Sequence, residues 1–172
     1  MVEPIPGCSS SYHPCYASGV IEPRWLSETQ LRAWEGFLAV STVINRRIEQ
    51  QLKEDAGLSH SQYEVLARLS AAPNGELRMT ELAGIGKTSK SGLTYQVGQL
   101  EKAGLVRRIA HSEDERGVIA RLTPKGRRLL EATAPAHAEL VRSVFVDPLT
   151  PAQFDGLAEA IDVLRAAGMN VR

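Results

Sequence analysis

The sequence lacks any apolar run long enough to cross a membrane. A membrane-spanning helix needs about 20 consecutive apolar residues, and the uncharged apolar stretches of this chain are far shorter. Residues 2–20 also lack the basic start and the apolar centre of a secretory signal peptide. We therefore expect a soluble, cytoplasmic protein with no membrane partner.

Cysteine is scarce, and no catalytic or metal-binding pattern is visible. The two cysteines, Cys8 and Cys15, are spaced like no common zinc site. The four histidines are scattered, and no nucleophile, base and orienting group form a recognisable set. We expect no cofactor, no metal and no enzymatic activity. In a reducing compartment both thiols are expected to be inert.

One short stretch imitates the phosphate-binding loop of nucleotide-hydrolysing enzymes. Residues 84–88 run Gly-Ile-Gly-Lys-Thr. The true motif needs a glycine five residues before Gly86, where this chain has Glu81, and it follows a strand. Residues 80–85 instead have a helical pattern, so we reject this interpretation.

The chain does contain enough apolar residues for one packed domain. Hydrophobic residues make up 43% of its 172 positions, which excludes general disorder. Residues 1–24 hold four prolines, two glycines and four serines without periodicity, and are predicted to be a flexible tail. The domain is therefore expected over residues 25–168.

Helix starts are marked by one repeated device, the capping box, in which a hydroxyl residue precedes a glutamine by three positions. It occurs at Ser27–Gln30, Ser59–Gln62 and Thr150–Gln153. These pairs predict helices over about 28–54, 60–71 and 151–167. Thr123 and Pro124 predict a further helix to about Phe145 by the same cap logic, with a bend at Pro135.

The first of these helices carries a long apolar stripe that a small domain cannot cover. Its members recur every three or four residues: Leu31, Trp34, Leu38, Ser41, Ile44, Ile48 and Leu52. The simplest cover is a second copy of the chain. We therefore expect a homodimer, with residues 27–54 and 124–168 as the dimerisation helices.

The stretch 79–122 has the layout of a winged helix-turn-helix. A short helix at 80–85 and a Gly86-Lys87 turn precede a second helix at about 88–103, which ends at Gly104. Two β-rich runs follow, 105–110 and 118–122, on either side of a charged tip at 111–117. The expected fold is mainly α (α+β), with a winged helix-turn-helix core at about 58–122 between the long terminal helices.

Charge and helix faces suggest that this core binds DNA. Residues 78–128 contain 11 Lys/Arg against 5 Asp/Glu in a chain of zero net charge. On the helix at 88–103, Leu93, Val97 and Leu100 share one face. The opposite face carries groups suited to base edges, with lysines near its start for phosphates: Thr88, Ser91, Thr94, Tyr95 and Gln99, with Lys87 and Lys90.

The charged tip can present an arginine. Asp114 and Arg116 are close enough in sequence to pair, which would hold the arginine extended toward a minor groove. Lys125, just after the second β run, is expected to add a further phosphate contact.

Several runs together resemble the DNA-binding core of MarR-type transcriptional regulators. They are Ser91-Gly92-Leu93-Thr94, the stretch 100–108, Asp114-Glu115-Arg116 and the stretch 122–126. The resemblance implies a triangular dimer whose recognition helices and wings occupy successive grooves of double-stranded DNA at a pseudo-palindromic operator. It also implies repression relieved by a small ligand. Tyr95 stands where the family often has arginine, and Gly98 where an acidic residue is common, so the preferred base sequence does not carry over.

Three further hypotheses come from the residues. An aromatic or phenolic acid could bind near Trp34, Phe37, His60 and Tyr63, which could equally be core residues. A winged helix can also bind a protein partner in place of DNA. Oxidation of Cys8 and Cys15 to a disulfide could regulate the protein.

Overall fold

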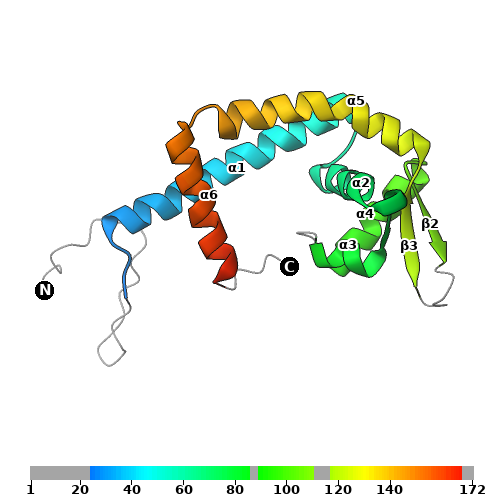
Figure 1. The fold of residues 1–172 in the computed structure, drawn as a ribbon, viewed down its shortest axis with the longest axis horizontal. Helices are drawn as coiled ribbons and strands as arrows, with labels where there is room; N and C mark the ends of the chain where they lie inside the picture. The colour runs from blue at the N-terminus through cyan, green and yellow to red at the C-terminus, as the bar shows by residue number, and fades with distance from the viewer. Residues whose placement is uncertain (1–23, 86–88, 111–116, 168–172) are drawn as a thin grey trace, which may run out of the picture. The chain divides into compact units, whose positions relative to one another are not determined.

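The computed structural model describes residues 24–85, 89–110 and 117–167, and they form a mainly helical winged-helix fold (Figure 1). The chain divides into two compact units, residues 1–38 and 39–172. The elements in chain order are α1 (Glu28–Ala56), α2 (His60–Ala71), the 3-10 turn η1 (Pro73–Gly75), β1 (Glu76–Arg78), α3 (Met79–Ile85), α4 (Lys90–Lys102), β2 (Val106–Ala110), β3 (Val118–Leu122), α5 (Pro124–Val141), the π-helical turn η2 (Arg142–Val146) and α6 (Pro151–Ala166).

The three predicted capping boxes are present. In each, the hydroxyl oxygen of the cap accepts from the backbone N–H of the glutamine, and the glutamine side chain accepts from the backbone N–H of the cap. Because each box satisfies two N–H groups that the helix cannot, the starts of α1, α2 and α6 lie where the sequence predicted them.

The small sheet has the strand order β1-β3-β2, with antiparallel pairing throughout. The sequence did not predict β1, which has only three residues. It follows a turn in which Asn74 and Gly75 both have positive φ angles, 57° and 72°. In the register, Leu77 lies beside Ala120, which is completely buried, so this face of the sheet covers the core.

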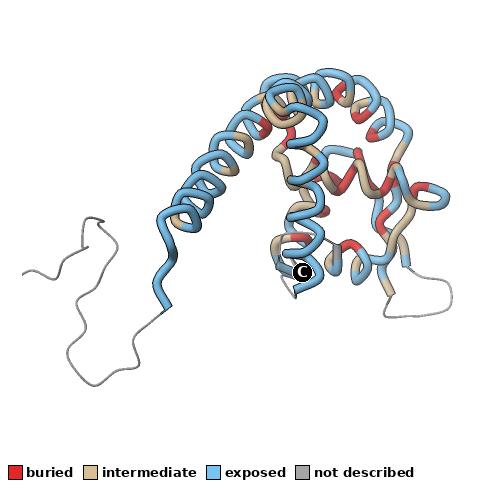
Figure 2. Tube along the Cα trace, turned by 60° about the vertical axis from the view of Figure 1, so that its left-hand side comes forward, coloured by how far each residue is buried: buried red, intermediate tan, exposed pale blue. Residues whose placement is uncertain are grey.

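The core of the second unit lies where α2, α4 and the sheet meet. Its fully buried large side chains include Leu52, Leu66, Leu69, Leu82, Val97, Leu100 and Val106. Figure 2 shows buried positions along α2 and α4 and almost continuous exposure along α6. The apolar stripe of α1 divides: Ile48 and Leu52 are buried, whereas Trp34 and Leu38 are exposed.

Helix α4 starts later than the sequence suggested. Its cap is Ser89, whose ψ angle of 160° is not helical and whose hydroxyl accepts from the Gly92 N–H at 3.2 Å. The predicted start at about Thr88 is therefore wrong by two residues. At the other end, Gly104 has a φ of 71° and the Leu105 N–H donates to the Leu100 carbonyl at 2.9 Å. This glycine termination is the one the sequence predicted.

Helix α5 begins against the end of α4. The Thr123 hydroxyl donates to the Gly104 carbonyl at 2.8 Å and accepts from the Gly126 N–H at 3.0 Å. A Cβ at position 126 would overlap the Leu105 carbonyl oxygen. The helix therefore needs glycine here because its first turn touches the backbone that leads into β2.

Helix α5 continues through Pro135, and the regular α-helix gives way to η2 after Val141. The helix thus ends four residues before the predicted end at Phe145, although the chain stays helical in the π-turn. None of the helices in the described ranges has both the length and the apolar character needed to span a membrane.

Candidate functional site

The two faces of α4 differ as the sequence predicted. Leu93, Val97 and Leu100 are buried against the core. Tyr95 is 63% exposed, on the side of the helix that faces away from the core. The remaining predicted contacts on this helix are exposed, except that Gln99 is half-buried: Lys90, Ser91, Thr94 and Gln99. We call these four residues together with Tyr95 the α4 surface.

Hydroxyl groups on the α4 surface already have local partners. Thr94 Oγ1 donates to the Lys90 carbonyl at 2.9 Å, so this hydroxyl is left mainly as an acceptor. The Ser91 and Ser89 hydroxyls lie 3.1 Å apart. Ser89 was not among the predicted site residues, because the run Thr-Ser-Lys-Ser offers several possible helix caps. The surface thus presents acceptors, a phenol and an amide, without a carboxylate.

Four predicted contacts fall outside the described residues. Lys87 and Thr88 belong to the segment 86–88, and Asp114 and Arg116 belong to the segment 111–116. Their roles remain predictions. The described part of the site is therefore the α4 surface and the strands that lead to and from the wing tip.

An ion pair that the sequence did not predict joins α4 to β2. Arg108 donates through its backbone N–H and its Nε to the two carboxylate oxygens of Glu101, at 3.0 and 2.7 Å. These hydrogen bonds and the arginine charge hold the pKa of Glu101 below its usual range. The seven-residue separation across a glycine turn gives no helical spacing by which this pair could have been found.

Lys125 lies at the C-terminal end of α4. Its Nζ donates to the Ala103 carbonyl at 2.9 Å, while the side chain remains exposed. A lysine ammonium at the negative end of a helix dipole stabilises that end. A phosphate contact by Lys125 stays a prediction, and the structure adds a capping role.

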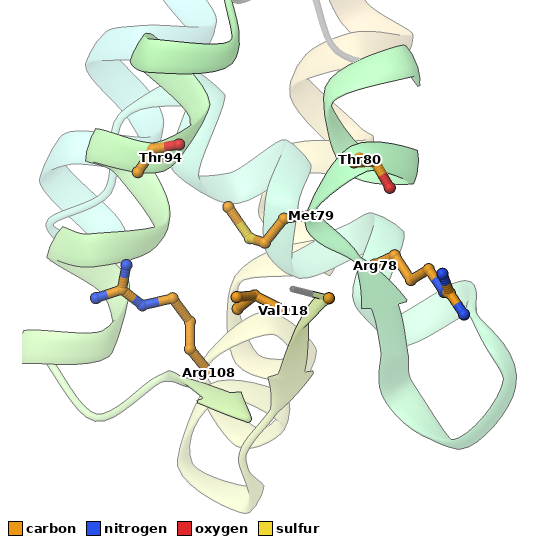
Figure 3. A pocket seen from close by; sticks show the side chains of 7 residues that line it. Arg78, Met79, Thr80, Thr94, Arg108 and Val118 are labelled. Carbon is orange, nitrogen blue, oxygen red and sulfur yellow. The ribbon is translucent and has the colours of Figure 1, made fainter. Parts of the chain in front are cut away.

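A cavity of about 340 Å³ lies between α3, α4 and the strands (Figure 3). Met79, Thr94, Arg108 and Val118 are among its lining residues, and Figure 3 shows the Arg78 side chain directed away from the others. None of the four predicted ligand contacts lines this cavity.

The predicted ligand contacts separate into pairs. In the first unit, the rings of Trp34 and Phe37 stack with centroids 6.2 Å apart, and both are more than half exposed. In the second unit, His60 and Tyr63 lie three residues apart on α2. The Tyr63 ring contacts His137 of α5, with centroids 4.5 Å apart. The sequence did not single out His137, because a contact across so many residues leaves no local signal.

Burial shifts the pKa of both Tyr63 and His137. It raises the pKa of the Tyr63 phenol. It also lowers the pKa of His137, with a smaller contribution from the charge of His60. Both shifts favour the neutral side chains.

Comparisons with known proteins agree on one family. The model of the MarR family matches residues 58–118. The crystal structure of Sco3205, a MarR family transcriptional regulator from Streptomyces coelicolor in complex with DNA, is 38% identical with a TM-score of 0.83, covering 86% of this chain and 92% of that one. AbsC, a MarR family regulator from the same organism, is 34% identical with a TM-score of 0.81, covering 84% and 97%.

A curated relative, the transcriptional repressor YetL of Bacillus subtilis, is 33% identical over 88 residues. That match spans 51% of this chain and about half, 53%, of YetL. The two Streptomyces regulators are matched over more than nine tenths of their length. The chain therefore belongs to the MarR family of transcriptional regulators.

Proposed function

We propose that the protein is a homodimeric, sequence-specific regulator that binds double-stranded DNA through the α4 surface. The observation that carries the proposal is the outward polar face of a helix whose other face is fixed in the core. Sco3205, which resembles this chain over most of its length, was solved in complex with DNA, and this supports the proposal.

The proposed contacts divide by chemistry. Tyr95, Thr94, Ser91 and Gln99 are the base-reading group, joined by Thr88, because hydroxyl and amide groups match the donors and acceptors of the major groove. Lys90 at the start of α4 is a phosphate contact, joined by Lys87 and Lys125. Arg116, held by Asp114, is proposed to enter the minor groove.

The test begins with selection of bound fragments from a genomic DNA library. Tyr95→Phe and Tyr95→Ala are then measured on the selected site and on single-base variants of it. A base contact is worth about 1–3 kcal/mol, so loss of the phenol should change the ranking of the site variants. Lys90→Gln should weaken all sites alike and flatten the salt dependence.

Arg47→Gln is the matched control, because Arg47 is an exposed cation on another helix, α1. Unchanged ranking in both Tyr95 variants would show that this face does not read bases.

Arg116→Ala should weaken binding markedly. If the DNA affinity does not change with salt concentration, the alternative is favoured, in which the winged helix binds a protein partner.

A dimer is supported by apolar side chains that this chain does not cover. On α6, Ile161, Val163 and Leu164 are exposed, and α1 exposes Val40 and Val43 besides its aromatic pair. Exposed apolar surface of this extent usually marks an interface. A pseudo-palindromic operator would match the two-fold symmetry of the dimer.

We further propose that the protein represses transcription and responds to an aromatic or phenolic acid. YetL, named a repressor, supports the first part. For the ligand, the support is the pairing of aromatic groups at Trp34–Phe37 and Tyr63–His137. Calorimetry with candidate acids tests this, with DNA affinity measured alongside. Absence of heat together with unchanged affinity would remove the ligand proposal.

A redox response through Cys8 and Cys15 remains the alternative mode of regulation, and both residues lie outside the described ranges. Replacing both by serine separates the two modes. An oxidant response that persists in this variant would end the redox alternative.

A further inference from the structure

His137 lies where three helices of the second unit meet. Its ring contacts the Tyr63 ring of α2 at a centroid distance of 4.5 Å and an interplanar angle of 51°. Its Nδ1 lies 3.2 Å from Oε1 of Gln51 on α1. A single imidazole on α5 therefore joins α5 to both α1 and α2.

The hydrogen bonds around Gln51 determine which ring nitrogen carries the proton. Gln51 Nε2 donates to a carboxylate oxygen of Asp55 at 2.7 Å, and a carboxylate can only accept. Gln51 Oε1 is thus the atom that faces His137, and an amide oxygen also only accepts. The Nδ1 of the neutral ring must then be the protonated nitrogen. A second proton has only Nε2 to bind.

No carboxylate pairs with His137 among the described residues, so a second proton would not be neutralised. The titratable residues of α2 at this junction are His60, Tyr63 and Glu64. His60 Nε2 lies 3.9 Å from Oε1 of Glu64. The charged residues of α1 at the junction are Asp55 and Glu49. Asp55 accepts a hydrogen bond from Gln51, and Glu49 accepts one from the His60 backbone N–H at 2.8 Å. On α5 itself the nearest charged residue in sequence is Glu139, which is exposed.

The direction of the proton effect follows from burial. The pKa of His137 is lowered from 6.5, first by burial and then by the charge of His60. The packed junction therefore binds this proton less readily than a loosened one. Stability that the junction provides is fully present above pH 6.5 and is lost as pH falls toward the lowered pKa.

A change at this junction can reach the α4 surface through α2. Tyr63 belongs to the same buried cluster as Leu66 and Leu69 of α2 and Leu93 and Val97 of α4. Since a close-packed core transmits a shift of one helix to its neighbours, a displaced α2 alters the setting of α4.

We propose that His137 is a proton-sensitive latch. With a neutral ring it holds α5 against α1 and α2, and when Nε2 takes a proton the junction loosens and the affinity of the α4 surface for DNA falls. The DNA part of this inference rests on the proposed function. The loosening itself does not.

The test compares the wild-type protein with His137→Gln, which retains a hydrogen-bonding side chain but cannot titrate. DNA affinity at constant ionic strength and thermal unfolding are both measured from pH 7.5 to 5.5. Between these limits the wild type should lose roughly five- to tenfold more affinity than the variant, a typical size for coupling between two sites. Its unfolding temperature should also fall more steeply.

A second variant, His60→Gln, covers the case in which His137→Gln does not fold. Removal of the neighbouring charge should raise the pH midpoint of His137, followed by NMR of the imidazole C–H signals, and should move the affinity loss to higher pH. If His137 were purely structural, its own midpoint would still rise, but the pH at which DNA affinity is lost would not move. If DNA affinity and unfolding temperature vary with pH in the same way in the wild type and in both variants, the latch is wrong.

The two proposals fail in different ways. A wild type that binds no selected DNA at pH 7.5 defeats the proposed function, and the latch is then judged by the unfolding profiles alone. DNA binding at pH 7.5 with equal acid loss in wild type and His137→Gln defeats the latch and leaves the proposed function intact.

Discussion

The winged-helix core and the last helix are built from similar local signals, but they differ in what covers them. Helix α2 has a capping box and an apolar face, and its Leu66 and Leu69 are completely buried. Helix α6 has the same capping box and an apolar face, yet it has no buried residue and its Val163 is 67% exposed. A capping box can start a helix, but a second surface is needed to bury its apolar face.

The polar groups of the winged-helix core find their hydrogen-bond partners within one chain. After α4, the Leu105 N–H donates to the Leu100 carbonyl, and the Thr123 hydroxyl donates to the Gly104 carbonyl. Glu101 binds Arg108 across the connection from α4 to β2. No buried side-chain nitrogen or oxygen among the described residues is left without a hydrogen-bond partner. The core should therefore be stable by itself, whereas α6 should depend on a partner. Four measurements test this contrast.

The largest effect is expected from a cavity in the core. Leu66→Ala removes a completely buried side chain, so it should lower the free energy of unfolding by about 2–5 kcal/mol. Urea unfolding measures this loss. The control is Leu157→Ala on α6, a half-buried leucine outside the core cluster. A loss as large at position 157 as at position 66 would erase the contrast.

The next effect concerns the proposed dimer. Burying one leucine or isoleucine is worth about 1.5–3 kcal/mol, which is roughly a ten- to hundredfold change in a dissociation constant. Leu164→Lys should therefore weaken the dimer by at least that much in sedimentation experiments while the core still unfolds cooperatively. Arg165→Ala, at the exposed neighbouring position, is the control. A dimer that tolerates Leu164→Lys would exclude this face of α6 from the interface.

Two glycines of the winged-helix region differ in the space around them, Gly126 being closely packed and Gly98 open. Gly126→Ala would push a Cβ into the Leu105 carbonyl, and overpacking of this kind costs about 1–3 kcal/mol. At Gly98 of α4 nothing lies within 4 Å of such a Cβ. Gly98→Ala should stabilise the protein by about 1 kcal/mol, since alanine favours helix over glycine. Thermal unfolding that moved both variants in one direction would contradict this account.

The smallest effect is expected at the exposed ion pair. The pKa of Glu101 is lowered mainly by its hydrogen bonds to Arg108. The pair thus contributes stability above the ordinary glutamate pKa of 4.5, and this is lost as pH falls through the lowered value. Glu101→Gln should slightly destabilise the protein at neutral pH and flatten the pH dependence below 4.5. Because the pair is partly exposed, a large effect would mean that α4 depends on it more than the geometry indicates.

Much of the site follows from local pattern. Three-residue spacing of caps and glutamines predicts the helix starts, and the period of Leu93, Val97 and Leu100 assigns the inner face of α4. These features need only neighbours in sequence. By contrast, β1 is too short for any alternation, and the three hydroxyl residues Thr88, Ser89 and Ser91 made the start of α4 ambiguous. In both cases the wider fold selected one of several local options.

By itself, the sequence determined the order of the six α-helices and the two strands of the wing, the two faces of α4 and the resemblance to MarR-type regulators, because these depend on residues close along the chain. Only the tertiary structure decided which apolar faces are covered, why position 126 must be glycine, and that His137 meets Tyr63 and Gln51. Those outcomes depend on contacts between distant segments. A side chain's neighbours across the fold are set by packing, which no local period records.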